Sequence, residues 1–124
     1  MEAASQLTVL VVEDYADMRE ALRFVLADAG YDVVLAANGR EALDYLRDHS
    51  VACVLLDMLM PVLDGWQFLE QSAAIPKPRP PVIIITALPA ISPDWAEAHG
   101  CDGWLKKPVS MSELLGDIRR VVAA

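Results

Sequence analysis

Five side chains with useful chemistry stand at or directly after the ends of short apolar runs. They are two adjacent acids, Glu13 and Asp14, a third acid, Asp57, a hydroxyl, Thr86, and a lysine, Lys107. A carboxylate can attack phosphorus as a nucleophile, while hydroxyl and ammonium groups donate to phosphoryl oxygens. Oxygen ligands without His or Cys suit Mg²⁺, and Mn²⁺ accepts the same set. The residue types therefore predict a site that holds a phosphoryl group together with a divalent cation.

The apolar runs themselves predict strands. They are continuous rather than alternating, which is typical of strands that are covered on both faces in a parallel sheet. We expect strands over Leu7–Val12, Tyr31–Ala36, Val51–Leu56, Val82–Thr86 and Asp102–Leu105. Because ligands bind beyond the carboxyl ends of such strands, the site is expected at that edge of the sheet.

Between these runs, apolar residues recur at helical spacing. Helices are expected over about Asp17–Gly30, Gly39–His49, Asp64–Ala74, Pro93–His99, and from a capping box at Ser110–Glu113 to Val122. The fourth should be short, since two prolines restrict it. The alternation predicts an α/β fold: a doubly wound five-stranded parallel sheet with five helices, flavodoxin-like in architecture. If the strand order is 2-1-3-4-5, the first and third strands are neighbours and the three acids converge.

Length and composition fit one domain. The chain has 124 residues, of which 55% are hydrophobic and 23% charged. We expect a single domain over residues 1–124, with a core from about 7 to 122 and no output domain after Val122. The run Pro76–Pro81 is interpreted as a stiff surface loop, because a domain boundary there would leave the second half with little core. Cys53 and Cys101 belong to no Cys/His cluster and are interpreted as small buried residues.

Charge and hydropathy limit the partners. A net charge of −8, from ten basic and eighteen acidic residues, argues against direct nucleic-acid binding. No apolar stretch approaches the ~20 residues that a membrane-spanning helix needs, so no membrane contact is expected. The first residues, Met1–Gln6, lack the basic and apolar regions of a secretory signal. These features predict a cytoplasmic protein.

Four stretches closely resemble the receiver domains of bacterial response regulators. They are Val11–Asp14, Leu55–Gly65, Ile85–Ala87 and Leu105–Pro108. The D-x-x-M-P-x-x-D-G pattern that starts at Asp57 is the most specific of them. The match runs from Leu7 to about Val122 and is similar to single-domain receivers of the chemotaxis-regulator type. The resemblance implies a phosphoprotein of a two-component or phosphorelay system.

This resemblance also implies roles for the acids. Asp57 would be the phosphoacceptor. Asp14 and Asp57 would ligate Mg²⁺ together with the main-chain carbonyl of Leu59, and Glu13 would act on the metal mainly through water. The chain would catalyse only its own phosphorylation and dephosphorylation, and so would not be an enzyme acting on other molecules.

Further roles follow from the resemblance for the switch residues. Lys107 would contact the phosphoryl group, with the Lys107–Pro108 bond cis. Thr86 would move towards the phosphate, and Trp104 would follow it inward. The phosphodonor would be a histidine kinase or a histidine phosphotransfer protein. A downstream protein would bind the surface of the fourth helix, fifth strand and fifth helix.

Some residues depart from the commonest receiver pattern. Trp104 is larger than the usual Tyr or Phe, which puts its inward movement in doubt. Leu59 and Leu88 are apolar where many relatives carry polar groups that orient water, and this predicts a long-lived phosphorylated form.

Three rival functions can be compared with the sequence. One is a degenerate receiver that binds proteins without phosphorylation, against which the retained Glu13, Asp14, Asp57, Thr86 and Lys107 argue. Another is an aspartyl-phosphate hydrolase or mutase, but such families need D-x-D and position 59 is Leu. A third is a flavodoxin-like cofactor carrier, but no Gly-rich phosphate loop follows Val12.

Overall fold

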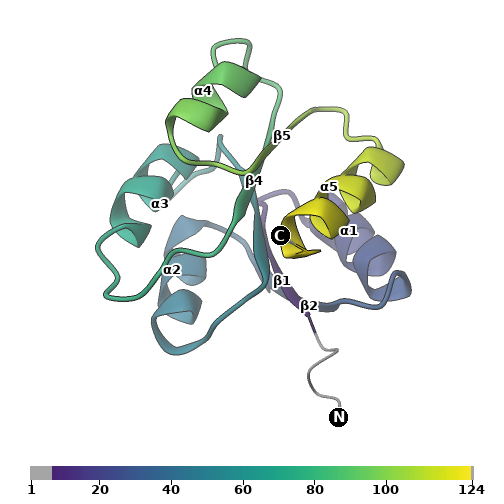
Figure 1. Ribbon diagram of the computed structural model, residues 1–124, viewed down its shortest axis with the longest axis horizontal. Coiled ribbons are helices and arrows are strands. Elements are labelled where there is room, and N and C mark those ends of the chain that lie inside the picture. The colour runs from purple at the N-terminus through teal and green to yellow at the C-terminus, as the bar shows by residue number, and fades with distance from the viewer. Residues whose placement is uncertain (1–6, 124) are drawn as a thin grey trace.

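The structure is a computed structural model that describes residues 7–123 of the chain. Strands and helices alternate along it, and one layer of helices lies on each side of a central sheet (Figure 1). The strands are β1 Thr8–Val12, β2 Asp32–Ala36, β3 Cys53–Asp57, β4 Val82–Thr86 and β5 Gly103–Lys106. The helices are α1 Ala16–Asp28, α2 Gly39–Asp48, α3 Gly65–Ser72, α4 Pro93–Ala98 and α5 Met111–Ala123.

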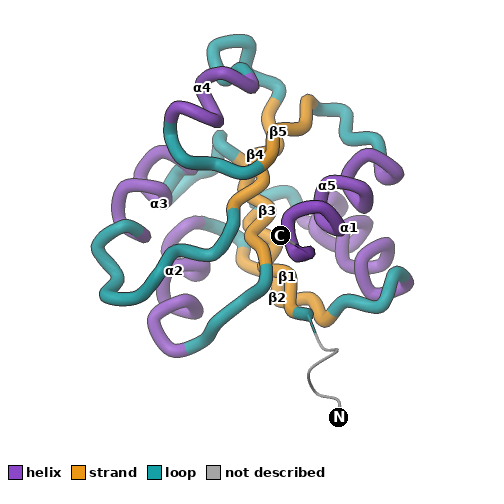
Figure 2. Tube along the Cα trace, viewed as in Figure 1, coloured by secondary structure: helices purple, strands orange, loops and turns teal. Residues whose placement is uncertain are grey.

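The sheet has the order β2-β1-β3-β4-β5, and every pair of neighbours is parallel. The predicted fold class and strand order are therefore confirmed. In the register between β1 and β3, Val9 lies opposite Cys53 and Val12 opposite Leu56. The five strands run side by side through the middle of the molecule (Figure 2). This order puts the carboxyl ends of β1, β3, β4 and β5 in one continuous row.

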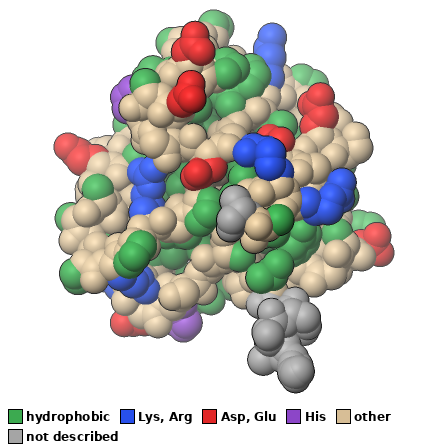
Figure 3. Space-filling view, viewed as in Figure 1, with side chains coloured by type: hydrophobic (Ala, Val, Ile, Leu, Met, Phe, Trp, Pro, Cys, Tyr) green, Lys and Arg blue, Asp and Glu red, His purple; other side chains and the backbone are tan. Residues whose placement is uncertain are grey.

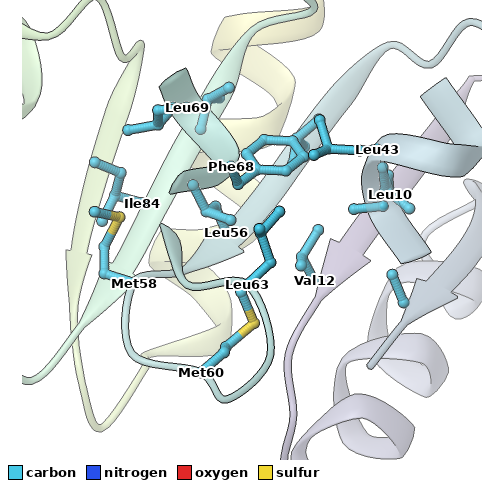
Figure 4. Packing of buried hydrophobic residues seen from close by; sticks show 14 of the residues in the cluster. Leu10, Val12, Leu43, Leu56, Met58, Met60, Leu63, Phe68, Leu69 and Ile84 are labelled. Carbon is cyan, nitrogen blue, oxygen red and sulfur yellow. The ribbon is translucent and has the colours of Figure 1, made fainter. Parts of the chain in front are cut away.

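Two apolar layers cover the sheet. Val9 and Val11 of β1 pack with Leu22 and Leu26 of α1 and with buried side chains of α5. The alternate side chains of β1 pack on the opposite face with residues of α2, α3 and α4, around Phe68. Figure 4 shows Met58, Met60 and Leu63 in this second layer with Phe68. Burial on both faces explains why the inner strands β1, β3 and β4 are almost continuously apolar.

Helix ends follow local signals, some of which differ from expectation. Gly30 takes a φ of 99° just beyond α1, as predicted for a residue that ends a helix. At α5, the N–H of Glu113 donates to Ser110 Oγ at 3.3 Å, which is half of the predicted capping box. A complete capping box starts α3 instead, between Asp64 and Gln67. The D-x-x-Q spacing of these two residues is the sequence signal for this capping box.

The fourth helix is short, as the prolines predicted. It covers six residues, with Ser92 as its N-cap and Pro93 in its first turn. The segment 76–81 is a loop before β4, as expected. Within residues 7–123, no helix is both long and apolar enough to cross a membrane.

The loop between β3 and α3 is tightly constrained. A Cβ added at Gly65 would lie 2.6 Å from Met58 Sδ and 2.7 Å from Met58 Cα. The N–H of Gly65 donates to the carbonyl of Met58 at 3.0 Å, so the loop closes on itself. Val62 has a φ of 71°, in the left-handed region that β-branched residues disfavour, and its side chain is 71% exposed. The loop therefore holds the residues after Asp57 in one defined path.

Candidate functional site

The carboxyl edge of the sheet brings the three acids together. Glu13 and Asp14 follow β1, and Asp57 is the last residue of β3. One carboxylate oxygen from each lies within 4.8 Å of the others. Glu13 and Asp57 are buried, whereas Asp14 is exposed. The sequence had placed Asp57 just after its strand, but pairing with β4 extends the strand by this one residue.

A cavity of about 290 Å³ opens at this edge. Its lining comes from the ends of strands and from the loops that follow β1, β3, β4 and β5. The lining residues are Glu13, Asp14, Tyr15, Asp57, Leu59, Thr86, Ala87, Leu88 and Lys107. A cavity of this size has room for a small anion and a cation with its water.

Lys107 connects two of the three acids, Glu13 and Asp57, across the cavity. Its Nζ lies 3.1 Å from Glu13 Oε1 and 3.4 Å from Asp57 Oδ2. The Lys107–Pro108 bond is cis, as the resemblance implied. The neighbouring Lys106 ends β5 and is exposed, as expected for a solvated charge.

The electrostatics leave Asp57 only partly compensated. Burial, and after it the negative charge of Glu13, raises the pKa of Asp57 to about 6 from an ordinary 3.8. The charge of Lys107 and the N–H of Leu59 lower this pKa without cancelling the increase. Burial also lowers the pKa of Lys107, but the negative charges of Asp57 and Glu13 outweigh it, so that pKa is raised. The site therefore carries excess negative charge that a cation can relieve.

The donor set fits a magnesium ion. Three carboxylates that converge within 4.8 Å offer only oxygen ligands, and no thiol or imidazole lines the cavity. Mg²⁺ prefers such ligands and keeps several of its waters, for which the cavity has room. The raised pKa of Asp57 supports this fit, because burial and the nearby charge of Glu13 disfavour its ionised form, which a bound cation would stabilise.

Thr86 and Leu59 border the same cavity. Thr86 is the last residue of β4, and its buried Oγ1 accepts a hydrogen bond from the N–H of Leu88 at 3.0 Å. Because that oxygen is the acceptor, its own O–H stays available as a donor. Leu59 donates its N–H to Asp57 Oδ1 at 3.2 Å, and its side chain is 63% exposed at the rim.

Trp104 is not part of the cavity lining. It lies on β5, half-buried, against the apolar layer beneath α2, α3 and α4. Its Nε1 donates to the carbonyl of Ile91 at 2.7 Å, directly before the N-cap of α4. The indole thus joins β5 to the start of α4.

Two residues near the acids were missed from the sequence. Tyr15 lines the cavity and donates its N–H to Glu13 Oε2 at 3.2 Å. Arg19 of α1 donates from Nη1 to the carbonyls of Glu13 and Asp14, both at 2.9 Å. The only sequence signal for either residue was its closeness to the acidic pair.

On the face seen in Figure 3, the described Lys and Arg side chains are scattered among Asp and Glu rather than gathered in one basic area. A basic stripe is what phosphate-backbone binding needs.

Comparisons with known proteins identify the family of the chain. The response regulator receiver domain model matches residues 9–119. Response regulator Rre1 of Synechocystis sp. is 36% identical over 124 residues, which cover 97% of this chain and 53% of the relative. Response regulator MprA of Mycolicibacterium vanbaalenii is 37% identical over 115 residues, 92% of this chain and 49% of the relative. The chain thus spans about half the length of these curated relatives.

Solved structures give the same result. The chemotaxis response regulator CheY4 of Vibrio cholerae is 32% identical, with a TM-score of 0.81 over 94% of this chain and 98% of the other. The receiver domain of a sensor histidine kinase from Pseudomonas aeruginosa is 28% identical, with a TM-score of 0.85 over 96% of this chain and 99% of the other. That structure has a magnesium ion coordinated in its active-site cleft. Sequence, fold and acidic site together show that this chain belongs to the family of response regulator receiver domains.

Proposed function

We propose that the chain is a phosphoacceptor domain of two-component or phosphorelay signalling, with Asp57 as the residue that accepts the phosphoryl group. The phosphodonor would be a phosphohistidine on a histidine kinase or a histidine phosphotransfer protein. One observation carries the proposal: Asp57 is buried at a strand end, contacts Lys107, and lies within 4.8 Å of two further acids. Burial and contact select this carboxylate from the exposed acids of the surface.

The proposed step is a displacement at phosphorus. A carboxylate oxygen of Asp57 attacks the phosphorus, a P–O bond forms, and the P–N bond to the donor histidine breaks. The imidazole nitrogen leaves with the bonding electron pair and takes up a proton. Asp57 must be ionised to attack, and a pKa of about 6 keeps it mainly so at neutral pH.

Residues of this chain would hold and stabilise the transferred group. Asp14, Asp57 and the carbonyl of Leu59 would hold Mg²⁺, and Glu13 would act on it through water. When bound, the cation supplies positive charge against the oxygens of the phosphoryl group. Lys107 would supply a second positive charge next to Asp57. The O–H of Thr86 can donate to a phosphoryl oxygen.

Phosphorylation would change the surface formed by α4, β5 and α5, to which a downstream protein would bind. Thr86 and Trp104 are the proposed switch residues. Trp104 can turn inward only if its hydrogen bond to the Ile91 carbonyl breaks, which would release the segment before α4. The indole therefore gives the start of α4 a direct connection to β5.

The test is phosphorylation with a small-molecule donor, followed by intact mass spectrometry. Incubation with phosphoramidate or acetyl phosphate and Mg²⁺ should add the mass of one phosphoryl group, and a chelator should prevent it. Asp57→Asn should show no adduct. The control Asp44→Asn, which changes an exposed acid paired with Arg47 on α2, should be phosphorylated like the wild type. No adduct with either donor would instead support a receiver that binds proteins without phosphorylation.

A further inference from the structure

Arg19 makes an unusual contact with the loop that carries two of the acids. Its single Nη1 donates to two successive main-chain carbonyls, those of Glu13 and Asp14, both at 2.9 Å. An Nη1 has two N–H bonds, so each carbonyl can receive one of them. Within residues 7–123, no backbone N–H donates to either carbonyl. The arginine thus satisfies two acceptors that the fold leaves open.

Asp14 depends on this contact more than Glu13 does. Glu13 is fixed at its N–H by the carbonyl of Ala36, and its carboxylate accepts from Tyr15 and Lys107. In the described part of the chain, the hydrogen bond from Arg19 is the only one that Asp14 makes. The exposed carboxylate of Asp14 is therefore aimed by the main chain alone, and Arg19 holds that main chain.

Arg19 is itself well placed to act as a brace. It lies in the first turns of α1, where its own N–H donates to the carbonyl of Tyr15 at 3.0 Å. Because the main chain of Arg19 is fixed in a helix turn, its side chain can hold the preceding loop in place. Hydrogen bonds from an ionised donor are also about twice as strong as neutral ones. The brace connects α1 to both acids without touching the cavity, since Arg19 is not among its lining residues.

We propose that Arg19 is a positioning residue for the cation site, which it serves by clamping the main chain of Glu13 and Asp14. This inference rests on the proposed function, because it assumes that these acids hold Mg²⁺. It assigns Arg19 no contact with the metal or the phosphoryl group. Its effect passes through the direction of the Asp14 carboxylate.

The clamp and the charge of Arg19 predict opposite effects on Mg²⁺ binding. A positive charge near a cation site repels the cation, so charge removal alone should strengthen Mg²⁺ binding. Loss of the clamp should weaken it, because Asp14 would no longer be held towards Asp57. Replacing a group that orients a metal ligand typically weakens metal binding by about tenfold or more. The direction of the change therefore separates the two explanations.

The experiment is a calorimetric titration of the chain with Mg²⁺ alone. We expect Arg19→Gln to weaken Mg²⁺ binding about tenfold. Arg19→Lys keeps the charge but replaces the fork with one ammonium, and should fall between Arg19→Gln and the wild type. Arg23→Gln is the matched control, since Arg23 lies one turn further along α1 and, among residues 7–123, pairs only with Glu20. That control should leave the affinity unchanged.

A second readout needs no metal. The amide of Tyr15 donates to Glu13 within the clamped loop, so its hydrogen exchange, followed by NMR, should be faster in Arg19→Gln than in Arg23→Gln. Unchanged or tighter Mg²⁺ binding in Arg19→Gln, with unchanged exchange, would overturn the inference while leaving the proposed function intact. No Mg²⁺ binding by the wild type would overturn both. If Arg19→Gln fails to fold, Arg19→Lys replaces it in both measurements: weaker Mg²⁺ binding than the wild type supports the inference, and unchanged binding and exchange overturn it.

Discussion

Replacing Asp57 by asparagine is predicted to stabilise the protein against unfolding at neutral pH when no divalent cation is present. Asp57 is only 5% exposed, and its carboxylate lies close to the charge of Glu13. Asparagine has nearly the same size and imitates the neutral form of the acid. The substitution therefore removes an unfavourable buried charge while it preserves the packing.

The magnitude follows from the pKa of Asp57. Its folded-state pKa of about 6 exceeds the ordinary 3.8, so the folded state binds the proton more tightly than the unfolded state does. This difference corresponds to about 3 kcal/mol of unfolding free energy. The penalty is absent below about pH 4, grows as the pH rises, and is complete above about pH 6. Asp57→Asn should thus gain up to about 3 kcal/mol near pH 7 and almost nothing near pH 4.

Urea unfolding, followed by circular dichroism in the presence of a chelator, measures this effect. The wild type, Asp57→Asn and the exposed control Asp44→Asn would be compared at both pH values. The control should change the unfolding free energy by less than about 1 kcal/mol, because exposed ion pairs contribute little. Saturating Mg²⁺ should stabilise the wild type and reduce the difference, since it binds the folded state. If Asp57→Asn is no more stable than the wild type near neutral pH, the reasoning about uncompensated charge is wrong.

Three further predictions concern single residues. Val62→Asn should raise the unfolding free energy by about 1 kcal/mol in urea titrations, because Asn tolerates a left-handed backbone better than Val. The control Val62→Ala should be stabilised less. A lower unfolding free energy in Val62→Asn would contradict the strain inferred from the φ of 71°. Trp104→Phe should lower the unfolding free energy by about 1 kcal/mol in the same titrations, because it removes the hydrogen bond to the Ile91 carbonyl. Trp66→Phe is its control, and equal losses in both would argue against that bond. Leu59→Asn should shorten the lifetime of the phosphorylated form several-fold in mass-spectrometric decay assays, because an amide at the cavity rim can hold a water. The control Leu59→Met should leave the lifetime unchanged. An unchanged lifetime in Leu59→Asn would refute the proposed effect of an apolar residue at this position.

Much of the fold could be predicted because the three inner strands, β1, β3 and β4, are buried on both faces. That burial requires continuous apolar runs, and the runs are visible in the sequence. The strand boundaries were less accurate, as β3 shows. The apolar run begins at Val51, but β3 begins at Cys53, where it pairs with Val9 of β1. Pairing partners set such boundaries, and hydropathy alone does not contain them.

The positions around the cavity could be predicted because parallel strands end at a common edge. The structure brings Glu13, Asp14 and Asp57 within 4.8 Å of one another, while the roles assigned to them are still predictions. Arg19 could not be identified from the sequence, because it resembles the ordinary surface residue Arg23 of the same helix. Only the path of the loop, which directs two carbonyls at Arg19, distinguishes them.

Conformations that oppose local preference were also beyond the sequence. Valine disfavours a positive φ, so no local rule predicts the left-handed backbone of Val62. The N–H of Leu63 donates to the carbonyl of Pro61 at 2.8 Å, so the chain turns tightly at Val62. The contact of Trp104 with Ile91 is similar in kind, because it depends on how β5 and the segment before α4 pack together.

The most direct measurement of the central claim locates the phosphoryl group within the chain. After phosphorylation with phosphoramidate and Mg²⁺, borohydride reduces an aspartyl phosphate to homoserine, which peptide mass spectrometry can assign to one residue. We predict homoserine at position 57 and at no other acid. Modification at Glu13 or Asp14, or none in a folded and magnesium-bound protein, would contradict the assignment of Asp57 as the phosphoacceptor.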